Sequence, residues 1–347
     1  MSTIHKKMTS ISFILILCLS LFSGCASTKP TEPQSKTNFF LGTVVTITIY
    51  DHASEEIFNQ VFERIRDIEN KMSMNIAQSE VMQINDQAGH HFVSVSKDTF
   101  DVIQKGIYYS ELSQGKFDIS IGPIVKLWNI GSEDARIPSS EEIAAKLKLV
   151  NYKDILLNET EQKVMLKDQD MMIDLGGIAK GFVADEVRTI LQNNGVEHAI
   201  INLGGNIFAL GNKPNGQPWA VGIQNPFEPT GTPLGAVKVA NQSVVTSGIY
   251  ERLLEKDGKK YHHILSTETG YPIENNLVGV SIITDQSTDG DGLSTTIFSL
   301  GLTEGMQLVE KLDGVDALFI TKDSEIYPTS GIKNNFHLSN DAFTLKK

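Results

Sequence analysis

The stretch from Met171 to Gly181, MMIDLGGIAKG, constrains this chain more than any other. It predicts an apolar strand, a turn at Gly176-Gly177, and the first turn of an amphipathic helix. Glycines at such a turn let the backbone approach a ligand closely, and the helix start directs unpaired N–H groups toward it. Lys180 puts a cation in the first helical turn, where the helix dipole disfavours positive charge. A bound anion such as a diphosphate would remove that conflict, so the stretch predicts a phosphate-bearing ligand.

The composition is that of a globular protein that does not bind nucleic acid. The 347 residues suffice for one large domain or two ordinary ones, and 40% of them are hydrophobic and 21% charged. A formal net charge of −12 offers nothing to neutralise nucleic-acid phosphates along a groove. An acidic protein that binds a polyphosphate needs a metal ion or local cations at its site.

The N-terminus is a targeting segment. Residues 5–7 are basic, and residues 11–22 form an apolar run too short to span a bilayer comfortably. Because Ser23-Gly24 then precede Cys25, residues 1–24 resemble a bacterial lipoprotein signal peptide, with Cys25 as the acylated first residue of the mature chain. An ordinary cleaved signal peptide with an incidental cysteine is the alternative.

The mature chain is expected to have no cysteine chemistry. The other cysteine, Cys18, would be removed with the signal, which excludes disulfides and a cysteine nucleophile. Residues 25–37, rich in Ser, Thr, Pro and Lys, predict a flexible tether to a domain at 38–347. The expected location is therefore extracytoplasmic, with a lipid anchor in the bacterial cell membrane.

Helix and strand signals are mixed along the domain. Helices are expected at 55–72, 79–85, 97–112, from a capping box at Ser139 to about 149, and at 179–193, 293–300 and 304–312. Strands are expected at 39–50, 154–157, 163–166, 171–174, 198–203 and 317–321. Strand signals dominate 219–283, which includes a hairpin turned at Asp257-Gly258. Because helices and antiparallel hairpins do not alternate strictly, we predict an α+β fold of mixed, largely antiparallel sheets with packed helices.

Two further stretches are ambiguous on their own. Residues 115–123 fit a helix end followed by a strand, with Trp128 as core filler. Residues 202–206 end a strand in a second Gly-Gly turn, which either lines the same site or only reverses the strand. Neither Gly-Gly pair has the spacing of the dinucleotide-binding fingerprint, so a Rossmann fold is disfavoured.

Two other stretches offer a base and metal ligands. His262 and His263 are adjacent on a strand and point to opposite faces, so at most one faces a given site. An imidazole suits general-base work on a hydroxyl, although half-exposed strand histidines are the alternative. Asp291 and Thr295, four apart at a helix start, share one face and offer the hard oxygen ligands that Mg²⁺ accepts. The alternative is an N-cap and a buried threonine.

Taken together and in order, the motifs resemble those of the ApbE-type FAD:protein FMN transferase family, the bacterial flavin transferases. The resemblance runs from about Phe39 to Pro328. The matching motifs are Leu41-Gly42-Thr43, Phe117-Asp118 before Gly122-Pro123, Asp174 to Gly181, Asn202 to Asn206, Thr246-Ser247-Gly248 with Tyr250, His263 to Gly270, and Asp291 to Thr295. The resemblance implies an ApbE-like, T-fold-related architecture.

The resemblance also implies an activity, which is Mg²⁺-dependent transfer of FMN from FAD to a threonine or serine hydroxyl of an acceptor protein, through a phosphoester bond and with release of AMP. It implies His263 as general base, and Gly177 (through its carbonyl), Asp291 and Thr295 as metal ligands. The FAD contacts it implies are Leu41, Asn75, Lys116, Phe117, Asp118, Asp174, Lys180 and Leu265. The implied acceptor is a membrane electron-transport subunit or an extracytoplasmic flavoprotein.

The chain departs from the family pattern at two places. Asn75 stands where relatives often carry an aromatic residue. Ser266-Thr267 replaces the usual Asp-Pro after His263, which predicts a changed orientation of that loop or a changed metal site. Two alternatives therefore stay open: an FAD pyrophosphatase of the same fold, with water as the nucleophile, and a non-catalytic, lipid-anchored flavin-binding protein.

Overall fold

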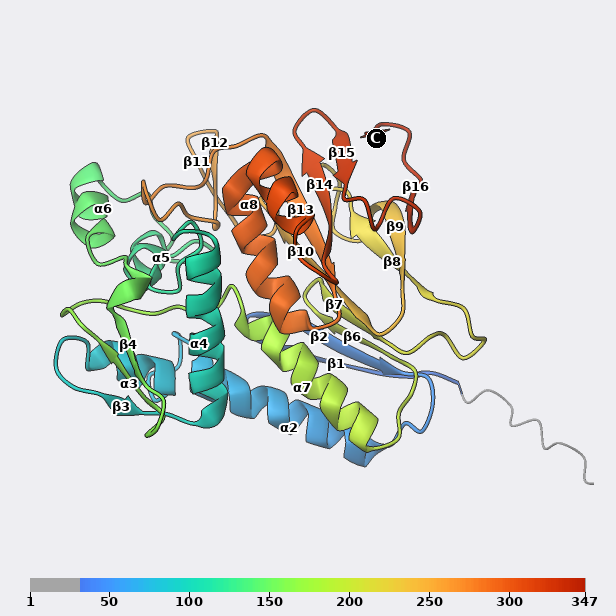
Figure 1. Ribbon diagram of the computed structural model, residues 1–347, viewed down its shortest axis with the longest axis horizontal. Helices are drawn as coiled ribbons and strands as arrows, with labels where there is room; N and C mark the ends of the chain where they lie inside the picture. Colours follow the sequence, from blue (N-terminus) through green and yellow to red (C-terminus); the bar gives the residue numbers. More distant parts are fainter. Residues whose placement is uncertain (1–31, 347) are drawn as a thin grey trace, which may run out of the picture. The chain divides into compact units, whose positions relative to one another are not determined.

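The structure, a computed structural model, describes residues 32–346 (Figure 1). The predicted signal peptide, Cys25 and most of the predicted tether lie outside the described residues. Strand β1 already begins at Gln34, so the prediction that the tether extends to residue 37 is wrong. No helix within residues 32–346 combines the length and the apolar character needed to cross a bilayer.

A nine-stranded sheet forms the centre of the described chain, and only its β15–β17 pair is parallel. Its strand order is β1 (Gln34–Phe40), β2 (Thr43–Ile49), β6 (Ala199–Leu203), β7 (Asn206–Leu210), β10 (Gln242–Gly248), β13 (Leu277–Thr284), β14 (Asp316–Thr321), β15 (Glu325–Pro328) and β17 (Thr344–Leu345). Every residue of β13 is buried, as expected for a strand covered on both faces.

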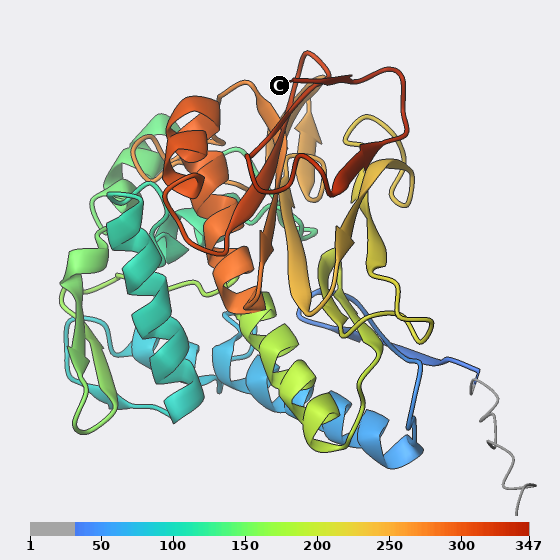
Figure 2. The same ribbon diagram turned by 45° about the vertical axis from the view of Figure 1, so that its right-hand side comes forward.

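The two faces of this sheet pack against different layers (Figures 1 and 2). Helices α2 (Glu55–Met72), α7 (Ala179–Asn193) and α8 (Ser287–Val309) share a hydrophobic core with one face. A three-stranded sheet, β16 (Phe336–Leu338), β9 (Pro233–Val239) and β8 (Trp219–Gln224), encloses a second core with the other face. Successive residues of β13 enter opposite cores, as Ile282 and Ile283 illustrate.

The remaining elements precede α7 or follow β10. They are α3 (Glu80–Asp86), β3 (Val93–Ser94), α4 (Lys97–Leu112), α5 (Gly122–Trp128), α6 (Ser140–Leu147), the 3₁₀ turn η1 (Tyr152–Asp154), β4 (Ile155–Asn158), β5 (Lys163–Leu166), β11 (Leu253–Lys256) and β12 (Lys259–His262). Strands β3, β5 and β4 form one small antiparallel sheet, and β11 pairs with β12. The predicted α+β class, with largely antiparallel sheets and packed helices, is confirmed.

Local sequence signals place several boundaries correctly. Ser54 Oγ accepts a hydrogen bond from the Ile57 N–H, and Ser139 and Glu142 form the predicted capping box. Asp257 and Gly258 turn the predicted hairpin with φ values of 53° and 73°.

Three predictions of elements are wrong. The predicted strand 39–50 is a hairpin, because Leu41 and Gly42 have positive φ and separate β1 from β2. Residues 171–174 form no strand, since only Met172 makes a single bridge, to Ile121. The strand expected within 115–123 is a loop that enters α5. The two predicted late helices are confirmed as two segments of α8 separated by non-helical backbone at Gly301 (φ 78°), although the first segment already begins at Ser287.

Candidate functional site

The beginnings of α7 and α8 pack closely together. A Cβ added to Gly181 would lie only 2.3 Å from the Ser287 carbonyl oxygen, so the approach requires glycine. The Asp185 carboxylate accepts hydrogen bonds from the Ser287 N–H (2.9 Å) and the Thr288 N–H (2.8 Å), which are otherwise unpaired at the start of α8. These contacts fix α8 against α7 and bring Asp291 beside Lys180.

The buried Asp291 carboxylate joins the two helices. Lys180 Nζ lies 3.3 Å from Asp291 Oδ1, and the Gly181 N–H donates to Oδ2 at 2.9 Å. Gly181 is the third residue of α7, where the N–H has no acceptor within the helix, so Asp291 supplies one. The Gly177 carbonyl precedes α7 and accepts no backbone N–H within residues 32–346, so it retains its acceptor capacity for another partner.

Gly177 also lies beside Thr295. A Cβ added to Gly177 would lie 3.8 Å from Thr295 Oγ1 and 3.0 Å from Phe117 Cε2. Thr295 Oγ1 is 3.2 Å from Ser247 Oγ, at the end of β10. The structure thus brings together the three predicted metal ligands, whose carboxylate, hydroxyl and carbonyl oxygens are the donor types that suit Mg²⁺.

Asp174 shapes the Gly-Gly turn from within. Its Oδ1 accepts a hydrogen bond from the Gly176 N–H at 2.8 Å, and its own N–H donates to the Ile119 carbonyl at 2.8 Å. Burial raises the pKa of the Asp174 carboxyl, while the Gly176 hydrogen bond and the charges of Arg252 and Lys180 lower it. The charge of Lys180 therefore acts on the Asp174 carboxyl.

The two histidines have different surroundings, and the prediction that both lie on a strand is wrong for His263, because β12 ends at His262. His262 is buried, and its Nε2 lies 3.0 Å from the Ile273 carbonyl oxygen. His263 lies in the field of Arg252 and Lys180, and burial followed by these two charges lowers the pKa of its imidazole to about 3. Its Nδ1 is buried and has no hydrogen-bond partner within residues 32–346. A neutral ring with a free nitrogen is the form that accepts a proton.

The loop that follows His263 is held without the usual Asp-Pro. Ser266 Oγ accepts hydrogen bonds from the Glu268 N–H (3.2 Å) and the Thr269 N–H (3.1 Å), which is what an aspartate does in such a turn. Thr267 Oγ1 donates to the Gly115 carbonyl at 2.7 Å and ties this loop to the segment that leads to Phe117. These two hydroxyls hold the loop at the place where the family pattern has Asp-Pro.

The 116–118 segment combines a half-buried cation with two buried side chains. Lys116 Nζ lies 3.5 Å from Glu268 Oε1, across to the His263 loop. Phe117 is buried beside Gly177. Asp118 is buried too, and its carboxylate accepts from the Ser120 N–H (2.7 Å) and the Tyr152 N–H (2.8 Å). Its carboxylate is thus committed to holding the loop.

The other predicted FAD contacts lie on three separate segments. Leu41 occupies the β1–β2 turn, where its N–H donates to Glu69 Oε1 of α2 at 2.6 Å. Asn75 is exposed in the loop after α2. Leu265 is buried in a small hydrophobic cluster with Trp128 and is not displayed toward solvent.

Sequence reasoning missed three residues near this site: Ser247, Glu251 and Arg252. Ser247 contacts Thr295, as given above. Glu251 is exposed as a residue, yet desolvation of its carboxyl, opposed by Lys180 and reinforced by Asp291, raises its pKa to about 7. The TSG-x-Y motif that runs directly into Glu251 and Arg252 was the available signal.

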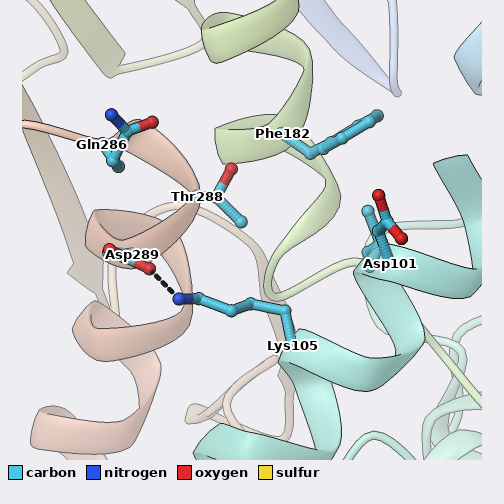
Figure 3. Close-up of a pocket in the computed structure, with 7 residues that line it drawn as sticks. Asp101, Lys105, Phe182, Gln286, Thr288 and Asp289 are labelled. Carbon is cyan, nitrogen blue, oxygen red and sulfur yellow. Dashed lines mark ion pairs between the residues drawn. The ribbon is translucent and has the colours of Figure 1, made fainter.

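Two cavities lie in the described chain outside these residues. One, of about 240 Å³, is lined by Asp101, Val102, Lys105, Phe182, Gln286, Thr288 and Asp289. Figure 3 shows its ion pair, in which Lys105 Nζ is 2.7 Å from Asp289 Oδ1. The other, of about 500 Å³, is lined by Asn85, Asp86, Ala88, His90, Pro123, Lys126, Leu127, Arg136, Lys146, Gln169, Asp170, Met171 and Met172. Neither contains a predicted site residue.

Comparison with known proteins gives consistent results. A model of the ApbE family matches residues 41–319. A FAD:protein FMN transferase of Klebsiella pneumoniae is 40% identical over 290 residues, which cover 84% of this chain and 90% of the relative. One from Treponema pallidum is 32% identical over 96% of this chain and 97% of the relative.

Solved structures agree in fold. The crystal structure of the ApbE protein of Thermotoga maritima matches with a TM-score of 0.80 and 31% identity, over 88% of this chain and 99% of that one. The flavin transferase ApbE of Vibrio cholerae matches with a TM-score of 0.78 and 25% identity, over 88% and 100%. On this evidence, the chain belongs to the ApbE family.

Proposed function

We propose that this protein transfers FMN from FAD to a threonine or serine hydroxyl of an acceptor protein, with Mg²⁺, forming a phosphoester and releasing AMP. The names of the Klebsiella and Treponema relatives support the transferase activity. The observation that carries the proposal is the buried Asp291 carboxylate, which joins Lys180 and the Gly181 N–H next to Thr295 and Gly177.

The chain's own groups divide the work by charge. Gly177, Asp291 and Thr295 would hold Mg²⁺, which when bound neutralises diphosphate oxygens and stabilises charge as the phosphorus–oxygen bond breaks. Lys180 adds a fixed cation at the beginning of α7. Such preorganised charges lower the barrier because they need no reorganisation during the reaction.

His263 is the residue that moves a proton. The acceptor hydroxyl oxygen forms a bond to the FMN-side phosphorus, the bond from that phosphorus to the AMP oxygen breaks, and the hydroxyl proton passes to His263. Its depressed pKa keeps the ring neutral and ready to accept a proton near pH 7. Because the ring is only weakly basic, it takes the hydroxyl proton as the bond between the hydroxyl oxygen and phosphorus forms and makes that proton acidic.

The acceptor and the location are part of the same proposal. We infer that the acceptor is a membrane electron-transport subunit or an extracytoplasmic flavoprotein, and that Cys25 anchors the enzyme outside the cytoplasm. The sequence pattern before Cys25 supports the anchor. Labelling cells with a radioactive fatty acid tests it: wild-type protein is expected to carry label and Cys25→Ala none, and equal labelling would contradict the anchor.

Incubation with FAD, Mg²⁺ and a threonine-bearing candidate acceptor tests the transferase activity. We expect an acceptor band with covalent flavin fluorescence after denaturing electrophoresis, and none with the threonine-to-alanine acceptor. Accumulation of free FMN without an acceptor would instead favour an FAD pyrophosphatase. Bound FAD without turnover in Mg²⁺ would favour a non-catalytic flavin-binding protein.

A further inference from the structure

Arg252 spans two distant segments beside the site. It follows the end of β10, and its stem packs over Gly131, where an added Cβ would lie 3.2 Å from Arg252 Cδ. Its guanidinium lies over the β1–β2 turn, where a Cβ added to Gly42 would be 3.4 Å from Nη2. The side chain thus reaches from the loop after α5 to the turn that carries Leu41.

Arg252 and Lys180 act on the same groups. Both charges lower the pKa of Asp174, of Glu251 and of His263. Coulomb interactions of this kind fade with distance, so the two cations face a common region from different elements, the α7 start and the loop after β10. Two cations near one region are what a diphosphate, with charge on each phosphate, requires.

Within residues 32–346 the Arg252 guanidinium enters no ion pair or hydrogen bond. Arg64, Arg136 and Arg188 bind acids of the chain, and Arg66 lies over the Phe40 ring. Arg252 is also exposed. The charge of Arg252 acts on the carboxyls of Asp174 and Glu251, but the side chain pairs with neither. Its five N–H donors are therefore available for a ligand.

We propose that Arg252 binds the FAD diphosphate together with Lys180 and thereby positions the donor for transfer. The planar guanidinium can donate two parallel hydrogen bonds to phosphate oxygens, which fixes orientation as well as charge. This inference rests on the proposed function, because it takes FAD as the donor. The inference assigns a role to Arg252, which was not among the predicted site residues. It also predicts that the loop after β10 forms part of the FAD site.

Binding measurements on matched variants test the assignment. Arg252→Met keeps the stem that packs over Gly131 and removes the charge, and Arg252→Lys keeps the charge without the planar fork. The control is Lys256→Met, which removes an exposed lysine at the end of β11, the strand that follows Arg252. Each full-length variant is titrated with FAD, ADP and riboflavin in EDTA, with melting temperatures recorded in parallel.

We expect Arg252→Met to weaken FAD and ADP binding by about tenfold to a hundredfold, and Arg252→Lys by less. Riboflavin, which has no phosphate, is expected to bind all variants alike, and Lys256→Met is expected to match the wild type. Unchanged FAD binding by Arg252→Met would overturn the proposal. So would equal losses of FAD and riboflavin, which would show a structural role. If the wild type binds FAD without transferring FMN, the proposed function fails while this inference stands.

Discussion

Lys180 Nζ lies 3.3 Å from Asp291 Oδ1, although the two residues are 111 positions apart in the chain. The contact exists because Gly181 and Asp185 hold the beginnings of α7 and α8 together. It explains how a lysine is tolerated in the first turn of α7, where the helix dipole opposes positive charge. A buried acid offsets the lysine in the free protein, and the donor diphosphate adds its charge during the reaction.

Asp291→Asn is expected to abolish transfer, with a loss of at least about a hundredfold in kcat, because the neutral amide is a poor Mg²⁺ ligand. Asp289→Asn is the control, since Asp289 lies on the same helix but pairs with Lys105 and Tyr109. The check is the rate of FMN transfer together with Mg²⁺ affinity by calorimetry. Unchanged transfer by Asp291→Asn would contradict the assignment of Asp291 as a metal ligand.

His263→Gln is expected to lower kcat for transfer by about 10²–10⁴-fold, the usual contribution of a general base, with little change in FAD affinity. Steady-state kinetics with varied acceptor, alongside FAD titration, separates the two effects. A variant that loses FAD affinity but keeps kcat would show that His263 binds the donor and does not move the proton.

His263 is also expected to shape the dependence of stability on pH. Because burial lowers its pKa from 6.5 to about 3, the unfolded chain takes up a proton before the folded protein does. Its contribution to stability is therefore complete above about pH 6.5 and declines as the pH falls toward 3. Thermal melts between pH 7 and pH 5 should fall less steeply for His263→Gln than for wild type. Parallel curves would contradict this depressed pKa.

Gly181→Ala is expected to destabilise the protein by about 1–3 kcal/mol, because its Cβ would meet the Ser287 carbonyl at 2.3 Å and force α7 from α8. Gly177→Ala meets only the Phe117 ring at 3.0 Å and is expected to unfold near the wild-type temperature. The effect of Gly177→Ala should instead appear as a lower rate of Mg²⁺-dependent transfer. Urea unfolding and transfer assays on both variants check the contrast, and equal destabilisation would contradict it.

Ser266→Ala is expected to cost about 1 kcal/mol in ordering the His263 loop, since two N–H groups lose their acceptor. Ser266→Asp, which restores the residue usual in the family, should retain activity because a carboxylate accepts the same bonds. Transfer kinetics of the two variants are the measurement. If Ser266→Ala is as active as Ser266→Asp, the turn does not depend on this acceptor.

Signals local in sequence predicted much of the fold, and tertiary contacts decided the rest. Serine caps placed α2 and α6 because capping is satisfied within one helical turn. The β1–β2 turn was missed because Leu41 is no turn former, and its positive φ coincides with a hydrogen bond from its N–H to Glu69 of α2. Residues 171–174 are apolar enough for a strand, but only Met172 finds a bridging partner.

The site residues also fall into those that sequence motifs predicted and those that only tertiary contacts reveal. The motifs predicted Lys180, Asp291, Thr295 and Gly177, and the structure brings them together. Arg252 was missed because nothing local reveals that its guanidinium reaches Gly42, about two hundred residues earlier in the chain. Leu265, which the resemblance placed at the flavin, belongs to a buried cluster with Trp128, which only the fold could show.

The most direct test of the account is a mass measurement on an acceptor protein incubated with the purified enzyme, FAD and Mg²⁺. The account predicts that the acceptor gains the mass of FMN less one water, on a threonine or serine, with one AMP released per modified acceptor. It predicts that EDTA prevents both products. FMN and AMP released in equal amounts with no change in acceptor mass would contradict transfer and identify water as the nucleophile.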